Sequence, residues 1–140
     1  SGANTRPMSD TDDIERIREQ KRERLERDLD GGTAPDDPVH VEGEPELTDL
    51  TSEYDVVLAD FYADWCGPCQ MLEPIVASLA AETPAAVAKV DVDANQSLAS
   101  QYGVRGVPTL VLFADGEAVE QMVGVQDADR LTSLIEQYTN

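Results

Sequence analysis

The chain has 140 residues, a length that suits one globular domain and is too short for two. Hydrophobic residues make up 41% of it, which is enough for a core. Acidic residues outnumber basic residues by 29 to 10, and the formal net charge is −19. A surface this acidic repels nucleic acids and anionic membranes, and no run approaches the roughly 20 apolar residues of a membrane span. We therefore expect neither a nucleic acid nor a membrane as a partner.

The basic residues are unevenly spread along the chain. Residues 46–140 contain Lys89, Arg105 and Arg130 against 16 Asp and Glu, so this segment carries a net charge near −13. Two interpretations fit: docking to a basic partner, or adaptation to a cytoplasm of high salt, where screening over about 3 Å at 1 M weakens the repulsion between acids. The scarcity of lysine, with Lys21 and Lys89 alone, favours the second. We predict an origin in a salt-loving archaeon.

The first part of the chain is predicted to lie outside the folded domain. Residues 1–7 precede Met8, which resembles a native start, and we interpret them as a cloning remnant. Residues 8–44 are predicted to form a charged extension, with a polar helix over 9–30 and then a linker rich in glycine, proline and aspartate. The N-terminus lacks the apolar segment of a secretory signal, so we expect a cytoplasmic protein.

The apolar residues of the predicted extension helix are Ile14, Ile17, Leu25 and Leu29. They are too few for a broad core-facing stripe, and a solvated helix tethered by a linker is the favoured interpretation. A helix that docks a partner protein is the alternative. In the linker, residues 39–41 could add a short edge strand, and His40 is expected to be exposed and without a catalytic role.

Residues 45–140 are predicted to form the folded domain. Apolar runs indicate buried strands, and apolar residues three and four apart indicate helices that pack on them. The expected elements are a short helix over 46–52, strands over 56–61, 86–93, 109–113 and 118–123, and helices over 67–82, 95–102 and around 131–138. Pro74 is expected to interrupt or kink the second helix, and Asp115-Gly116 marks a hairpin turn. The pattern predicts an α/β domain with a mixed central sheet of four to five strands flanked by helices on both faces.

Cys66 and Cys69 are the cysteines of the chain, and two residues separate them. They lie where a predicted strand gives way to the helix over 67–82, and the unpaired N–H groups and the dipole at a helix N-terminus favour a thiolate. A structural zinc site needs four ligands, and His40 is the one histidine of the chain. A purely structural disulfide would close a very small loop and stabilise little. A redox-active pair is the favoured interpretation.

The residues around this pair resemble a known family. Residues 60–69, Asp-Phe-Tyr-Ala-Asp-Trp-Cys-Gly-Pro-Cys, are similar to the active-site segment of thioredoxins. The similarity continues at the family's spacings in Pro74, 88–93, 102–110, Asp115-Gly116 and Val123-Gly124. It covers about residues 46 to 140. It implies the thioredoxin fold and a thiol-disulfide oxidoreductase, that is, a protein-disulfide reductase that reduces disulfide-containing client proteins and is recharged by a thioredoxin reductase.

The resemblance implies roles for four residues. Cys66 is the expected nucleophile that attacks a client disulfide, and Cys69 then resolves the mixed disulfide. Asp60 stands in a predicted buried strand, where a carboxylate is costly unless it is paired or protonated. By resemblance, Asp60 lies beneath the pair and is the acid/base for Cys69, with Lys89 on the neighbouring strand as its partner. A structural Asp60–Lys89 pair without catalytic effect is the alternative.

The resemblance also implies a docking surface for clients. Pro108 follows Val107 where the family carries a cis-proline loop, which would expose the Val107 backbone to an extended client segment and keep metal ions from the thiols. The expected flat apolar patch comprises Trp65, Gly67, Pro68, Gly106, Val107 and Gly124. No metal ligand and no cofactor besides the Cys66–Cys69 disulfide is expected, and the protein is expected to be a monomer.

Two positions depart from the family's pattern. Tyr62 stands where thioredoxins commonly have a second tryptophan, and Gln70 stands where many have lysine. Two other functions stay open: an oxidant or disulfide isomerase of the same fold, and a partner-binding module that uses the N-terminal helix. Gly67 and Pro68 between the cysteines favour the reductant.

Overall fold

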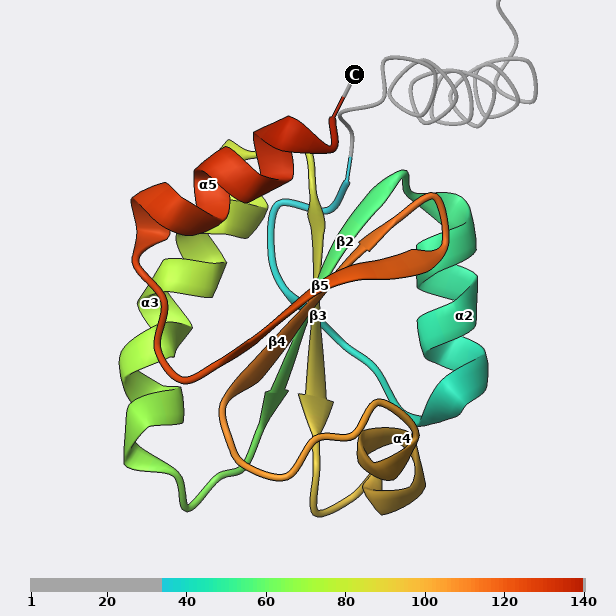
Figure 1. Cartoon of the computed structure of the whole chain (residues 1–140), viewed down its shortest axis with the longest axis vertical. Helices are drawn as coiled ribbons and strands as arrows, with labels where there is room; N and C mark the ends of the chain where they lie inside the picture. Colours follow the sequence, from blue (N-terminus) through green and yellow to red (C-terminus); the bar gives the residue numbers. More distant parts are fainter. Residues whose placement is uncertain (1–33, 140) are drawn as a thin grey trace, which may run out of the picture.

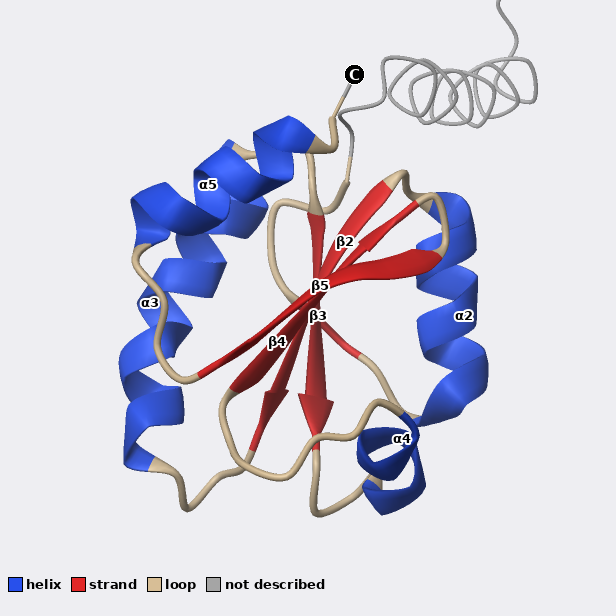
Figure 2. Cartoon of the chain, viewed as in Figure 1, coloured by secondary structure: helices blue, strands red, loops and turns tan. Residues whose placement is uncertain are grey.

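The computed structural model describes residues 34–139, in which a five-stranded sheet lies between two layers of helices (Figures 1 and 2). The strands are β1 (Val39–His40), β2 (Val56–Tyr62), β3 (Ala86–Asp91), β4 (Thr109–Ala114) and β5 (Glu117–Val123). The helices are α2 (Gly43–Glu53), α3 (Gly67–Glu82), α4 (Gln96–Gln101) and α5 (Ala128–Gln137). The mixed α/β sheet predicted from the sequence is confirmed.

The strands lie in the order β1-β3-β2-β4-β5. β1 and β2 run parallel to β3, whereas β4 runs antiparallel to both β2 and β5. Parallel neighbours need a crossover connection, and α3 supplies it between β2 and β3. The register of these two strands pairs Asp60 with Lys89, although 29 positions separate them in the sequence. A carboxylate and an ammonium thus meet in the middle of the sheet.

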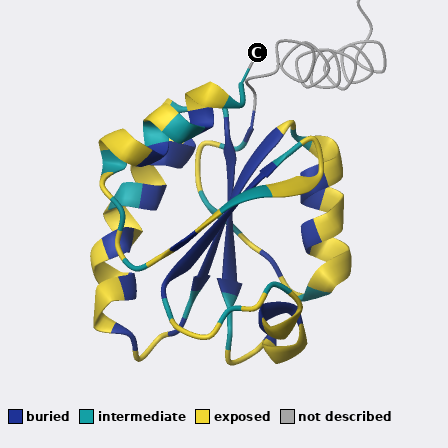
Figure 3. Cartoon of the chain, viewed as in Figure 1, coloured by how far each residue is buried: buried dark blue, intermediate teal, exposed yellow. Residues whose placement is uncertain are grey.

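β2 is buried on both faces, as a strand between two helical layers must be (Figure 3). Alternate residues point to opposite faces: Val57 and Phe61 pack in the core on the side of α2 and α4, and Leu58 packs on the side of α3 and α5. By the same alternation, Asp60 points to the side of α3. The strand therefore aims one charged side chain at the helix that begins with the cysteine pair.

α3 begins directly after the first cysteine. Cys66 caps the helix, and Pro68 stands in its first turn, where a missing N–H group leaves no hydrogen bond unmade. Leu72 and Val76 are fully buried and fix the helix on the sheet. The bounds agree with the prediction. The helix is continuous through Pro74, so of the two expected effects the interruption does not occur and the kink stays a prediction.

The bounds of three elements differ from the prediction by two residues or more. α5 begins at Ala128, three residues before the expected range, and in the other two elements a side chain outside the apolar pattern sets the bound. α2 begins at Gly43, three residues before the expected start, and the Gly43 N–H donates to Oδ1 of Asn95 at 2.7 Å. β3 ends at Asp91 rather than at position 93, because Oδ1 of Asp91 accepts a hydrogen bond from the N–H of Asp93 at 2.9 Å and turns the chain.

Residues just before the expected start of the domain are packed against the sheet. The possible edge strand is present as β1, and Ala34 and Val41 are buried. His40 is exposed, as expected, and its ring meets Tyr62 edge-on with 6.3 Å between centroids. The predicted cloning remnant and the extension up to residue 33 lie outside the described residues, so the domain boundaries stay a prediction. Among the helices described, none has the length and apolar character needed to cross a bilayer.

Candidate active site

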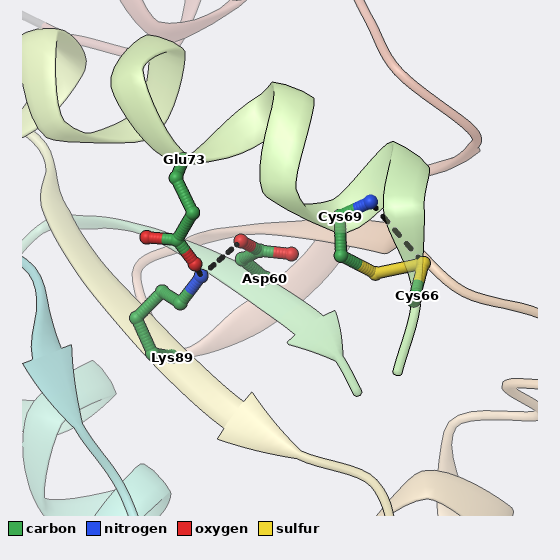
Figure 4. Close-up of polar contacts among 5 residues, drawn as sticks. All are labelled: Asp60, Cys66, Cys69, Glu73 and Lys89. Atoms are coloured by element: carbon green, nitrogen blue, oxygen red, sulfur yellow. Dashed lines mark hydrogen bonds and ion pairs between the residues drawn. A yellow bond between two sulfur atoms is a disulfide. The ribbon is translucent and has the colours of Figure 1, made fainter. Parts of the chain in front are cut away.

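The cysteine pair closes a disulfide at the N-terminus of α3 (Figure 4). The two Cα atoms are 5.2 Å apart, a usual spacing for a disulfide. Sγ of Cys66 accepts a hydrogen bond from the backbone N–H of Cys69 at 3.1 Å, one of the N–H groups that the first turn of a helix leaves unpaired. Both residues are nearly buried, with 4% and 2% exposed. Because the first sulfur lies at the positive end of the helix dipole, its thiolate is favoured once the pair is reduced.

Asp60 lies on β2 next to the disulfide and is completely buried. Its Oδ2 accepts a hydrogen bond from Nζ of Lys89 at 2.9 Å. Within residues 34–139, its Oδ1 has no hydrogen-bond partner, and Figure 4 shows this oxygen on the side that faces Cys69. Burial raises the pKa of Asp60 above its ordinary value, and the charge of Lys89 offsets part of that rise. A carboxylate that resists ionisation and keeps one oxygen free is able to hold a proton for the neighbouring thiol.

Lys89 lies between two carboxylates. Its Nζ also bonds Oε2 of Glu73, a half-exposed residue of α3. The same nitrogen is 4.2 Å from the centroid of the Tyr62 ring, a cation–π contact. Burial by itself would lower the pKa of Lys89, but the hydrogen bonds and charges of Glu73 and Asp60 outweigh it, and the pKa is raised. Lys89 is therefore a permanent cation at neutral pH.

Glu73 was not among the site residues expected from the sequence, although the spacing of residues on α3 offers a signal. Glu73 follows Cys69 by four positions, so the two share a face of the helix, and Leu72 beside it is fully buried. An acid on a helix face that meets the sheet needs a partner there, and Lys89 is that partner. Tyr62, which departs from the thioredoxin pattern, is the ring that Lys89 contacts.

Some of the residues expected to bind clients belong to the loop that precedes β4 or contact it. The Val107–Pro108 bond is cis, and Val107 packs against the cysteine pair. Thr109 Oγ1 donates to the Gly106 carbonyl at 2.7 Å. The Gly124 N–H donates to the Pro108 carbonyl at 2.8 Å, which joins the end of β5 to this loop. The sheet thus holds Gly106, Val107 and Gly124 in one surface beside the disulfide.

Trp65 forms the other side of this surface. It is 71% exposed, and its Nε1 donates to Oδ2 of Asp93 at 2.9 Å. A hollow of about 150 Å³ is lined by Trp65, Val92, Val104, Arg105, Gly106 and Val107. Gly67 and Pro68 are exposed at the start of α3 and do not line the hollow. The hollow thus shares Trp65, Gly106 and Val107 with the apolar patch expected from the sequence. Asp93, which holds the indole, was not among the expected residues.

The arrangement supports two-electron exchange between a dithiol and a disulfide, with the Cys66–Cys69 disulfide itself as the redox group. Within residues 34–139, no three side chains of His, Cys, Asp or Glu gather in a way that could hold a metal ion. The exposed His40 lies on β1 and does not join a ligand set there.

Known proteins similar to this chain include several thioredoxins. The thioredoxin family model matches residues 40–137. Thioredoxin of Chlamydia muridarum is 50% identical over 84 residues, which cover 59% of this chain and 82% of that protein. Thioredoxin of Staphylococcus aureus is 42% identical over 92 residues, which cover 64% of this chain and 88% of that protein.

Solved structures agree with these relatives. A mutant thioredoxin from Halobacterium salinarum is 71% identical, with a TM-score of 0.75 over 76% of this chain and 95% of that one. Fasciola hepatica thioredoxin is 34% identical, with a TM-score of 0.67 over 72% of this chain and 99% of that one. The Halobacterium structure also supports the salt-loving archaeal origin predicted from the charge. The family model covers most of the chain, and the disulfide lies where the family's active-site segment was predicted, so the chain belongs to the thioredoxin family of protein-disulfide oxidoreductases.

Proposed function

We propose that this oxidoreductase works as a reductant, which transfers two electrons from its dithiol to the disulfides of client proteins. The observation that carries the proposal is the Cys66–Cys69 disulfide at the N-terminus of α3, with the carboxylate of Asp60 buried next to it. Gly67 and Pro68 between the cysteines are typical of the reducing members of the family.

The reaction has two steps. In the first, the thiolate of Cys66 attacks one sulfur of a client disulfide; the client's S–S bond breaks, its other sulfur leaves as a thiolate and takes up a proton, and a mixed disulfide joins the two proteins. In the second, Cys69 gives up its proton and attacks Sγ of Cys66, which releases the client's second sulfur as a thiol and closes the Cys66–Cys69 disulfide. The client has gained two electrons and two protons, and the pair has lost them.

Asp60 acts as the acid/base for Cys69 in the second step, and Lys89 is its ionic partner. The unpartnered Oδ1, which faces Cys69 in Figure 4, supports this role, because a proton acceptor needs a free lone pair. Burial raises the pKa of Asp60 and so brings it closer to the pH range in which thiols exchange protons, which also supports the role.

We assign client binding to the surface formed by Trp65, Gly67, Pro68, Gly106, Val107, Pro108 and Gly124. The large exposed area of Trp65 and the hollow beside it support this assignment, because an extended client segment presents apolar side chains that such a surface can cover. The exposed Arg105 at the hollow would meet any acidic residue next to a client's disulfide.

We further propose that a thioredoxin reductase returns two electrons to the disulfide. In this scheme the protein works as a monomer in the cytoplasm, where thiols are kept reduced. The net charge of −19 supports a set of partners that includes neither nucleic acids nor membranes.

The redox midpoint of the Cys66–Cys69 pair tests the direction of electron flow. We expect about −270 mV in molar KCl, the value typical of thioredoxins. Trp65 lies beside the pair, so its fluorescence across a series of dithiothreitol buffers should report the ratio of the two states. Cys66→Ser, which has no pair to oxidise, is the control and should show no redox-dependent change. A midpoint near about −120 mV, as in a strong oxidant, would contradict the reductant and favour the oxidant or isomerase.

A further inference from the structure

Lys89 has two acidic partners that come from different elements. Its Nζ bonds Oδ2 of Asp60 on β2 at 2.9 Å and Oε2 of Glu73 on α3. The side chain of Asp60 is 0% exposed, that of Lys89 is 2% exposed and that of Glu73 is 50% exposed. Figure 4 shows the three side chains in sequence, with Lys89 in the middle and Asp60 next to Cys69. The row thus leads from the disulfide to solvent.

The balance of charge in this row depends on the proton of Asp60. When Asp60 is ionised, Lys89 is shared between two carboxylates. When Asp60 is protonated, the buried ammonium keeps a counter-ion in the carboxylate of Glu73. Without Glu73, the same protonation would leave a buried cation unpaired, which is strongly unfavourable. Without Glu73, Lys89 would therefore favour the ionised form of Asp60 more strongly.

We propose that Glu73 is a positioning residue that holds the ammonium of Lys89 while Asp60 takes up and returns the proton of Cys69. This inference rests on the acid/base role proposed for Asp60. Glu73 does not touch the reacting sulfur atoms and acts through Lys89. It fits this role because its side chain is 50% exposed to solvent and its carboxylate at the same time bonds the buried ammonium.

The other groups around the row leave this assignment intact. The titratable side chains nearby are Tyr62 on β2, the cysteine pair on α3, and Asp64 and Asp91 close to Tyr62. The register partner of Asp60 on β4 is Leu110, which is apolar. Burial is the largest influence on the pKa of Asp60 and raises it; the charge and hydrogen bond of Lys89 lower it, and the charge of Glu73 raises it. The repulsion between Glu73 and Asp60 and the sharing of Lys89 between them thus both raise the pKa of Asp60.

Glu73→Gln in the full chain tests the proposal, since the amide keeps the size of the side chain and removes its charge. We expect the pKa of Asp60 to fall by about one unit, the low end for loss of a nearby like charge. The acid limb of the pH profile for client release from the mixed disulfide should move to lower pH by a similar amount. Carbon-13 NMR of the Asp60 carboxyl group measures its pKa, and rapid mixing with a disulfide-bonded reporter protein measures the pH profile of client release.

Glu82→Gln is the matched control. It removes the same charge from the exposed last residue of α3, away from Lys89, and should move neither the titration nor the profile. If Glu73→Gln behaves like this control, the inference is wrong.

Asp60→Asn separates a failure of the inference from a failure of the proposed function. If Asp60→Asn changes the pH profile and Glu73→Gln does not, Glu73 has no such role and the proposed function stands. If Asp60→Asn leaves the profile unchanged, the acid/base role of Asp60 is wrong, and the inference fails with it. A shift caused by Glu73→Gln that disappears in the Asp60→Asn background supports the inference, because Glu73 then acts through Asp60.

Discussion

Asp60 occupies the centre of the sheet, where its neighbours Ala59 and Phe61 on β2 and its register partner Leu110 on β4 are apolar and buried. One oxygen of the carboxylate accepts a hydrogen bond from Lys89, and the other has no hydrogen-bond partner among the described residues. Full burial opposes ionisation more than the single ammonium assists it, so the pKa of Asp60 is raised. The fold is therefore less stable at any pH at which this carboxylate is ionised.

Asp60→Asn should stabilise the oxidised protein at pH 7, by on the order of 1–3 kcal/mol in the free energy of unfolding. The folded pKa lies above the unfolded value near 3.8, so the contribution of Asp60 is fully present below about pH 4 and is lost as the pH rises through the folded pKa. The difference in the free energy of unfolding between Asp60→Asn and the wild type should therefore become smaller as the pH falls toward 4. Urea unfolding in molar KCl at both pH values measures the difference.

Asp64→Asn removes an exposed carboxylate from the same segment and serves as the control for Asp60→Asn. It should change the free energy of unfolding by less than about 0.5 kcal/mol at either pH. An Asp60→Asn variant that is no more stable than the wild type at pH 7 would show that Lys89 compensates fully for burial.

At the residue scale, the cysteine pair and the Asp60–Lys89 contact can be predicted from the sequence. The two cysteines are close together in the chain, and the spacing typical of the family places Asp60 and Lys89 on neighbouring strands. Glu73 and Asp93 are missed. Glu73 meets Lys89 only because α3 crosses the sheet at one particular rotation, and Asp93 reaches the indole of Trp65 only because a turn follows β3. Apolar periodicity predicts neither the rotation of a helix on a sheet nor the path of a turn.

At the element scale, the best-predicted bounds belong to α3. Its start is marked locally by the Cys66 cap and Pro68, and its buried face repeats with helical spacing. α2 is predicted three residues too short at its start because Gly43 is held by Asn95, 52 positions away. Elements bounded by local chemistry are thus predictable from sequence, and elements bounded by distant side chains are not.

The C-terminal helix α5 shows how strongly one helix depends on its buried face. Leu131 and Ile135 are each 1% exposed, and they pack in the same core as Leu72 and Val76 of α3. The hydroxyl of Tyr138, at the end of α5, donates to Glu120 on β5 at 3.1 Å. The apolar face carries most of the attachment, because a hydrogen bond to a charged group contributes about 1.5–3 kcal/mol, whereas two buried side chains contribute about 2–5 kcal/mol each.

Leu131→Ala should lower the free energy of unfolding by about 2–5 kcal/mol, because it opens a cavity between α5 and α3. Leu134→Ala on the same helix is the matched control, since Leu134 is only partly buried and its truncation should cost clearly less. Calorimetry of the two oxidised variants in molar KCl measures both changes. Equal losses would mean that α5 is held by its end contacts and not by its buried face.

At the scale of the whole molecule, negative charge dominates. Within residues 34–139, the ion pairs join Lys89 to Asp60 and to Glu73, and both belong to the active site. Arg105 and Arg130 are exposed and are the other basic side chains of that part of the chain besides His40. Most surface carboxylates there consequently have no cation beside them, and they repel one another across the fold.

Stability should therefore depend on ionic strength. We expect the melting temperature of the oxidised protein to rise as KCl increases from a few millimolar to about 1 M, because the screening length falls from above about 30 Å to about 3 Å. Screening acts mostly below 1 M, whereas stronger burial of apolar surface by salt would keep growing beyond it. A steep rise that levels off near 1 M thus indicates relief of acid–acid repulsion. Sucrose at matched osmolality, which does not screen charge, is the control. An equal melting temperature in dilute buffer and in molar KCl would show that the acidic surface does not oppose folding.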